Sequence, residues 1–150
     1  KIRNLTPHPV VILHPAAIDG DLSQRGKLVA RERTEEHRLV VFASEGVARA
    51  AEVGGDPDGE IVVEVAGHLF AAKIPVRRAV RFARTIDLPA PADGVGLIVS
   101  QVTADAAAAE GRDCRDLFTP HEVVRDRGGN IVGCVSLRRA VALQVAHHLL

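Results

Sequence analysis

The sequence predicts an α+β fold that is mostly antiparallel β, a small barrel-like or sandwich sheet of about eight short strands with one short internal helix and a C-terminal helix. Short runs rich in valine and isoleucine recur between turns that contain glycine or proline, a pattern typical of strands. Two stretches alone combine helix-forming residues with helical spacing or a helix stop signal. With 150 residues, of which 47% are hydrophobic, we expect a single domain over residues 1–150 with its own core.

The first part of the chain is expected to supply short strands separated by turns. A proline bend divides the first strand into two pieces, residues 2–5 and 10–13. Residues 15–27 form a polar loop, and strands are expected over 28–33 and 38–43. Residues 46–53 fit either element, because their alanines favour a helix and the flanking glycines favour a strand.

In the middle of the chain, Asp56–Gly59 reads as a tight turn because it places Pro and Gly where such a turn needs them. It leads into an expected hairpin formed by residues 61–65 and 68–72. Residues 76–85 fit a half-exposed strand, since apolar residues and arginines alternate along most of it.

The last third contains the helical stretches. Residues 88–91 form a stiff connector, and the apolar residues 95–101 are expected to be a central strand. Thr103 resembles an N-cap for a helix over 104–110, which Gly111 ends. After a loop over 112–120, residues 123–126 and 131–137 flank Arg-Gly-Gly-Asn as a hairpin, and apolar spacing predicts a terminal helix over 138–149.

The composition argues against several classes of partner. Lys+Arg and Asp+Glu are equal at 19 each, and the only aromatic residues are four Phe. A nucleic-acid binder is normally basic and offers aromatic stacking surfaces, so no nucleic-acid partner is expected. The sequence has neither an apolar run of membrane-spanning length nor a signal-peptide pattern, so we expect no membrane partner and a cytoplasmic location. The sequence is compatible with a homo-oligomer.

The tripeptide Thr-Pro-His occurs twice, as Thr6-Pro7-His8 and as Thr119-Pro120-His121. Each copy precedes a valine pair, so each reads as a bend that leads into a strand and holds a histidine near solvent. If the two junctions meet in space, they form a paired-histidine site.

Four stretches of the chain resemble a family of small "NLTPH" proteins that are common in tailed phages and also found in actinobacteria. The resemblance rests on Asn4–His8, Gly46–Arg49, Leu88–Ser100 and Arg125–Cys134. It implies that residues 56–80 are an insertion. Arg112-Asp113 falls where that family tends to carry an Arg and an Asp, and the second Thr-Pro-His lies outside the family pattern. The family has no settled activity, so the resemblance supplies candidate positions and no reaction.

The main functional hypothesis is a pocket for a small polar, anionic molecule. Its expected binding residues are Asn4, Thr6, Ser100, Arg112 and Arg125, because arginines, a helix N-terminus and small polar groups suit an anion. His8 would act as the base and Asp113 would orient its ring if the protein is an enzyme. The opposing interpretation is that Asn4, Thr6 and His8 form a turn network that only holds the N-terminal strand.

Other readings remain open at the level of sequence. Zinc and a hydrolase activity would need ligands from the set Asp113, Cys114, Asp116, His121 and His8, whose spacing matches no established signature. A neighbouring arginine could activate Cys114 as a nucleophile, whereas Cys134 reads as a core residue. A non-catalytic, phage-type accessory module that sequesters a ligand or binds a host protein is the principal alternative. No cofactor is indicated.

Overall fold

The computed structural model describes residues 1–24 and 26–140. In it, the runs rich in valine and isoleucine form a seven-stranded sheet, here called the head sheet. The mostly β prediction is confirmed. The strands of the head sheet are β1 (Ile2–Asn4), β2 (Val10–Leu13), β3 (Leu28–Val29), β4 (Arg38–Phe42), β9 (Gly96–Ile98), β10 (Leu117–Arg125) and β11 (Ile131–Arg139). Two short 3-10 helices, Pro15–Ala17 and Thr34–His37, lie in the connections that precede β3 and β4.

The head sheet is mixed, so the mostly antiparallel prediction is wrong. Its order is β1-β9-β10-β11-β2-β4, with β3 also paired to β10. β10–β11 and β2–β4 are antiparallel, but β1–β9, β9–β10, β3–β10 and β11–β2 are parallel. The physical reason is the helix α1 (Gln101–Ala109), which follows β9 and carries the chain back so that β10 runs alongside β9 in the same direction.

The two ends of the head sheet approach each other, which makes it barrel-like. A parallel bridge joins Asn4 at the end of β1 to Ser44, two residues beyond β4. The Asn4 side chain is fully buried and donates hydrogen bonds to the carbonyls of His8 at 2.8 Å and Phe42 at 2.9 Å. One amide therefore ties the first strand to the last strand of the sheet.

Helix α1 covers one part of the head sheet with small side chains. Its buried residues include Ala104 and Ala107, which pack with Leu97, Val99 and Leu117 in one core cluster. The alanines allow the helix to lie close to the strands. The short internal helix was expected, but it begins earlier than Thr103, because the Ser100 side chain accepts the cap hydrogen bond from the Thr103 backbone N–H.

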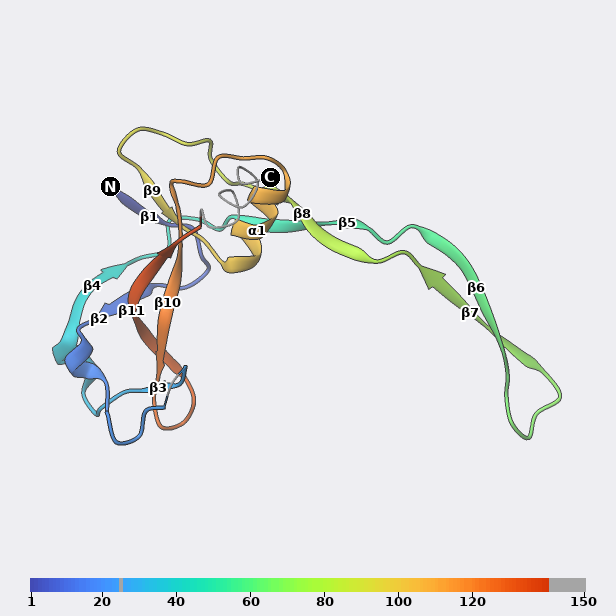
Figure 1. The fold of residues 1–150 in the computed structure, drawn as a ribbon, viewed down its shortest axis with the longest axis horizontal. Coiled ribbons are helices and arrows are strands. Elements are labelled where there is room, and N and C mark those ends of the chain that lie inside the picture. The colour runs from blue at the N-terminus through green and yellow to red at the C-terminus, as the bar shows by residue number, and fades with distance from the viewer. Residues whose placement is uncertain (25, 141–150) are drawn as a thin grey trace, which may run out of the picture.

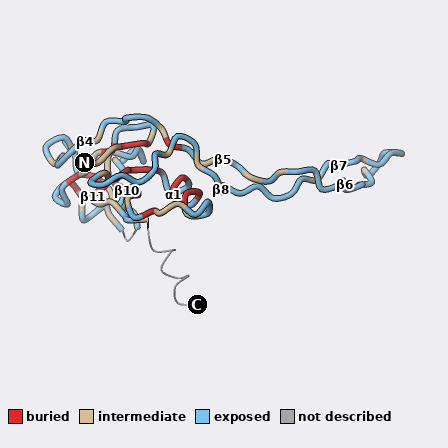
Figure 2. Tube along the Cα trace, turned by 90° about the horizontal axis from the view of Figure 1, so that it is seen from above, coloured by how far each residue is buried: buried red, intermediate tan, exposed pale blue. Residues whose placement is uncertain are grey.

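Two antiparallel ribbons extend from the head as one arm (Figures 1 and 2). The inner ribbon pairs β5 (Arg49–Gly54) with β8 (Val80–Ile86), and the outer ribbon pairs β6 (Pro57–Glu64) with β7 (Ala71–Arg77). Gly54 has φ +108°, and a Cβ there would lie 2.5 Å from the Ala79 carbonyl oxygen. A glycine is therefore required where the chain passes from one ribbon to the other.

Several predicted element boundaries differ from the structure. Asp56–Gly59 is not a tight turn, because Pro57–Glu64 is continuous strand with a register shift between Pro57 and Glu60. The second Thr-Pro-His is not a bend, because it lies inside β10. The stretch 76–85 is divided between β7 and β8.

The predicted C-terminal helix falls mainly outside the described residues. Its first two positions, Arg138 and Arg139, belong to β11. Among the described residues, no helix is long and apolar enough to cross a membrane.

We predict that Asn4→Ala lowers the free energy of unfolding by about 2–4 kcal/mol, because the carbonyls of His8 and Phe42 lose the donor of two partly buried hydrogen bonds. Urea denaturation measures this loss. Asn130→Ala is the matched control, since that asparagine is exposed in the β10–β11 turn. It should lower the free energy by less than about 1 kcal/mol. Equal losses for the two variants would show that Asn4 does not hold the sheet closed.

Candidate functional site

The segment between β1 and β2 is a hydrogen-bonded turn built on Asn4. Its Oδ1 accepts from the Thr6 backbone N–H at 2.9 Å and lies 2.7 Å from the Thr6 hydroxyl. That hydroxyl is also 2.9 Å from the His8 carbonyl oxygen, and Ser44 Oγ donates to the Thr6 carbonyl at 2.7 Å. These bonds form the turn network that the sequence offered as the opposing interpretation, and they use the main chain of His8 while leaving its exposed ring out of the network.

Three of the predicted site residues nevertheless line one cavity, of about 410 Å³. Thr6 and His8 come from the turn, and Ser100 comes from the N-cap of α1. The rest of the wall is largely apolar and comes from β2, β10 and β11. We call this the His8 cavity.

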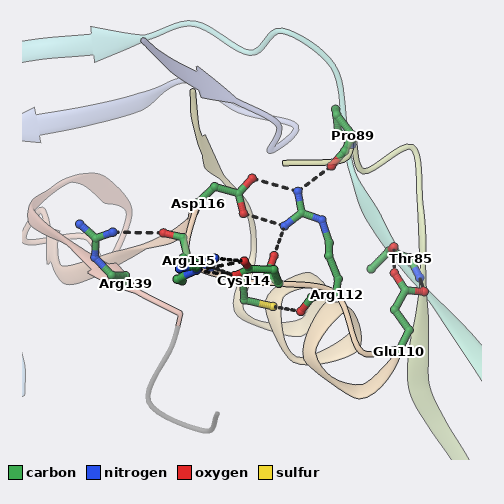
Figure 3. Close-up of polar contacts among 9 residues, drawn as sticks. Thr85, Pro89, Glu110, Arg112, Cys114, Arg115, Asp116 and Arg139 are labelled. Carbon is green, nitrogen blue, oxygen red and sulfur yellow. Dashed lines mark hydrogen bonds and ion pairs between the residues drawn. The ribbon is translucent and has the colours of Figure 1, made fainter. Parts of the chain in front are cut away.

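Arg112 and Asp116 form a nearly buried clamp at the opposite end of α1 (Figure 3). The guanidinium makes two hydrogen bonds to the Asp116 carboxylate, at 2.7 and 2.9 Å, and donates to the Pro89 carbonyl at 2.6 Å. It also donates to the Asp113 carbonyl at 2.7 Å. The fork-to-fork pairing engages both groups within the fold and fastens the 112–116 loop to the connector before β9.

Asp113 is paired with Arg115 rather than with a histidine. Its carboxylate accepts from Arg115 Nε and from Arg115 Nη2, the latter at 2.6 Å, and from the Arg115 backbone N–H at 3.0 Å. The hydrogen bonds from the Arg115 side chain, followed in size by the bond from its backbone N–H, lower the pKa of Asp113 to about 2. Neither Asp113 nor Arg112 lines the His8 cavity. The structure therefore separates Arg112 and Asp113 from Thr6, His8 and Ser100.

The two cysteines are buried, and neither forms a disulfide. Burial raises the pKa of the Cys114 thiol, an effect that the charge of Arg112 opposes, and burial also raises the pKa of Cys134. Cys114 donates to the Arg112 carbonyl at 3.2 Å. Within residues 1–24 and 26–140, no group of three His, Cys, Asp or Glu side chains is placed to hold a metal ion. The geometry of the described residues therefore favours neither Cys114 as an activated nucleophile nor a zinc site.

The second cavity, of about 810 Å³, is lined by cationic side chains and is here called the cationic cavity. Lys27, Arg125 and Arg138 lie in its wall together with His121, and Glu122 is the one acidic residue among the described lining residues. None of the three cations forms an ion pair with a described residue. The wall therefore carries an excess of positive charge in a chain whose formal net charge is zero.

A gap in the strand pairing accounts for the position of the cationic cavity. On the edge of β10 that faces away from β11, β9 pairs with Leu117 and Phe118, and β3 pairs with Val124 and Arg125. No described strand pairs with that edge over residues 119–123. Gln101, the first residue of α1, and Lys27 line the cavity on this side. The N-terminus of α1, which carries a partial positive charge, therefore adds to the basic character of the cavity.

The two Thr-Pro-His motifs lie at adjoining cavities. His8 lines the His8 cavity and His121 lines the cationic cavity, while Pro120 and Val123 belong to both walls. His121 Nδ1 is 3.3 Å from Ser136 Oγ, and the ring is also 3.8 Å from the Glu122 carboxylate. The histidines thus mark neighbouring sites, and no described metal cluster joins them.

Of the residues that line the cationic cavity, the sequence analysis named Arg125 as a binding candidate but did not name Lys27, Gln101 or Arg138. Arg138 lies opposite Thr119 because β10 and β11 extend beyond the predicted hairpin, into the stretches expected to be a loop and a helix. No feature of the sequence marked Lys27 as a cavity residue, because only the pairing of β3 with β10 brings it to the cationic cavity.

Comparison of this chain with family models, with curated proteins and with solved structures found no match. The functional argument therefore rests on the geometry of the two cavities and the arm.

We predict that Asp113 remains ionised at pH 3, where an ordinary aspartate, with a pKa near 3.8, is mostly protonated. The pKa is lowered in the folded state, so the pairing with Arg115 stabilises the fold above about pH 4, and this contribution is lost as the pH falls toward 2. A carboxyl-carbon NMR titration measures the pKa directly. In Arg115→Gln the pKa should return toward 3.8; an unchanged low pKa would mean that another group holds the carboxylate.

Proposed function

We propose that the head binds a small anionic molecule in the cationic cavity. The observation that carries the proposal is the set of three cations, Lys27, Arg125 and Arg138, around a cavity of about 810 Å³ with one described acidic residue. Lysine and arginine recognise phosphate and carboxylate groups by charge-assisted hydrogen bonds, and the backbone N–H groups at the start of α1 favour the same charge.

The three cations differ in how strongly the fold already holds them. Arg125 Nη1 donates to the Gly129 carbonyl at 3.0 Å, which fixes the arginine against the hairpin turn. Lys27 and Arg138 have exposed side chains and come from opposite sides of β10, through β3 and β11. This arrangement supports a fixed contact from Arg125 and closing contacts from the other two.

The geometry supports binding rather than the proton transfer that the sequence suggested. The sequence hypothesis had Asp113 orient the His8 ring, but Asp113 is engaged by Arg115 and does not line the His8 cavity. His121 lines the cationic cavity beside Ser136, so it is the histidine placed to contact the anion. The proposed roles of Thr6, His8 and Ser100 are then to shape the adjoining cavity, while Asn4 and Arg112 support the fold around it.

A second candidate function, a non-catalytic accessory module that binds a protein, is favoured by the arm. The outer ribbon coincides with much of residues 56–80, which the resemblance to the small "NLTPH" proteins marks as an insertion. An insertion that extends away from the head contributes nothing to the cationic cavity, so it calls for a separate role.

We predict that inorganic phosphate and citrate raise the melting temperature of the wild-type chain at low ionic strength, with the larger effect from the more highly charged citrate. Arg138→Gln and Lys27→Gln should each weaken binding about tenfold by isothermal titration calorimetry, because each removes one charge-assisted contact.

Arg127→Gln is the matched control, since Arg127 is exposed on the same hairpin and does not line the cavity. It removes one positive charge and should leave the affinity for both anions unchanged. The proposal fails if neither anion stabilises the wild-type chain, or if Arg127→Gln weakens binding as much as Arg138→Gln.

A further inference from the structure

One face of the outer ribbon carries a row of apolar side chains. Side chains alternate between the two faces of a strand, and Ile61 lies opposite Ile74 while Val63 lies opposite Ala72. With Val76, which continues the alternation, these residues form one face. Ile61 is 54% exposed and Ile74 is 48% exposed, and the ribbon lies far from the head in two perpendicular views (Figures 1 and 2). A two-stranded ribbon is only marginally stable in water, so this face calls for a partner surface.

The charges of the outer ribbon are divided between its two strands. β6 carries Asp58, Glu60 and Glu64 and no basic residue. β7 carries Lys73 and Arg77 and no acidic residue. The unpaired edge of β6 is therefore acidic and the unpaired edge of β7 is basic, so the ribbon is electrostatically complementary to a second copy of itself.

We propose that the outer ribbons of neighbouring copies of this chain lie side by side, with β6 of one copy against β7 of the next. Pairing of two β6 edges would oppose carboxylates, and pairing of two β7 edges would oppose cations. The unlike pairing is the arrangement that the charges favour.

This contact is heterologous, because each copy uses one edge to bind its predecessor and the other edge to bind its successor. Repetition of this contact gives a ring or a chain of copies, in which the outer ribbons are joined to one another and the heads lie at the periphery. The apolar faces of successive ribbons then lie on one surface of a continuous antiparallel sheet, which can cover them by curving upon itself. The inference rests on the arm alone and is independent of the anion site.

The test uses two charge-reversed forms of the full chain. The first carries Glu60→Lys with Glu64→Lys, and the second carries Lys73→Glu with Arg77→Glu. Sedimentation velocity and light scattering measure the mass over a wide range of concentration. The wild-type chain should form species larger than the 16.0 kDa monomer. Each reversed form should be monomeric, because its two edges then carry the same charge. An equimolar mixture of the two forms should assemble again, since every contact in an alternating array joins unlike edges.

The matched control is Glu35→Lys with Glu36→Lys, which makes the same change of charge on the head and should leave assembly intact. Far-UV circular dichroism confirms that each variant is folded. The proposal is overturned if the wild-type chain stays monomeric, as it would if the arm bound only a different protein. It is equally overturned if a reversed form assembles by itself, or if the mixture of folded reversed forms stays monomeric.

Discussion

The buried side chain of Asn4 is the contact on which the head depends. Its amide group donates to the carbonyls of His8 and Phe42, and its carbonyl oxygen accepts from the Thr6 N–H. The backbone of Asn4 pairs with Ile98 and bridges to Ser44. A buried amide with all of these partners is stable where an unpaired one would be costly. Through it, the N-terminal strand holds β4 and β9 in place.

The same closure determines where the cavities lie. Because β9 ends at Ile98 and the chain turns at once into α1, the edge of β10 is left uncovered until β3 pairs with it at Val124. The cationic cavity occupies that interval, and the Asn4 turn lines the cavity beside it through Thr6 and His8. The Arg112–Asp116 clamp fixes the other end of the helix, so the position of α1 is held from both ends.

Much of the local structure could be predicted from the sequence, because it is set by short-range chemistry. The hairpin around Gly128-Gly129 follows from its turn residues, and strands β2 and β4 follow from short runs of valine and other apolar residues. The parallel pairing and the closure could not be predicted, because they depend on partners far apart in the chain, such as Asn4 and Phe42. The sequence suggested Arg112 as a ligand-binding residue and Asp113 as a catalytic one, but only the structure shows that Asp116 and Arg115 engage them.

The central functional claim is that the uncovered edge of β10 is an anion site. An NMR titration of the isotopically labelled chain with inorganic phosphate tests it most directly. The account predicts that the backbone amide signals of Thr119, residues 121–123, Gln101 and Lys27 shift together with one dissociation constant, while those of the arm arginines Arg81 and Arg84 stay constant. Shifts that follow the exposed arginines of the arm and leave residues 119–123 unchanged would contradict it.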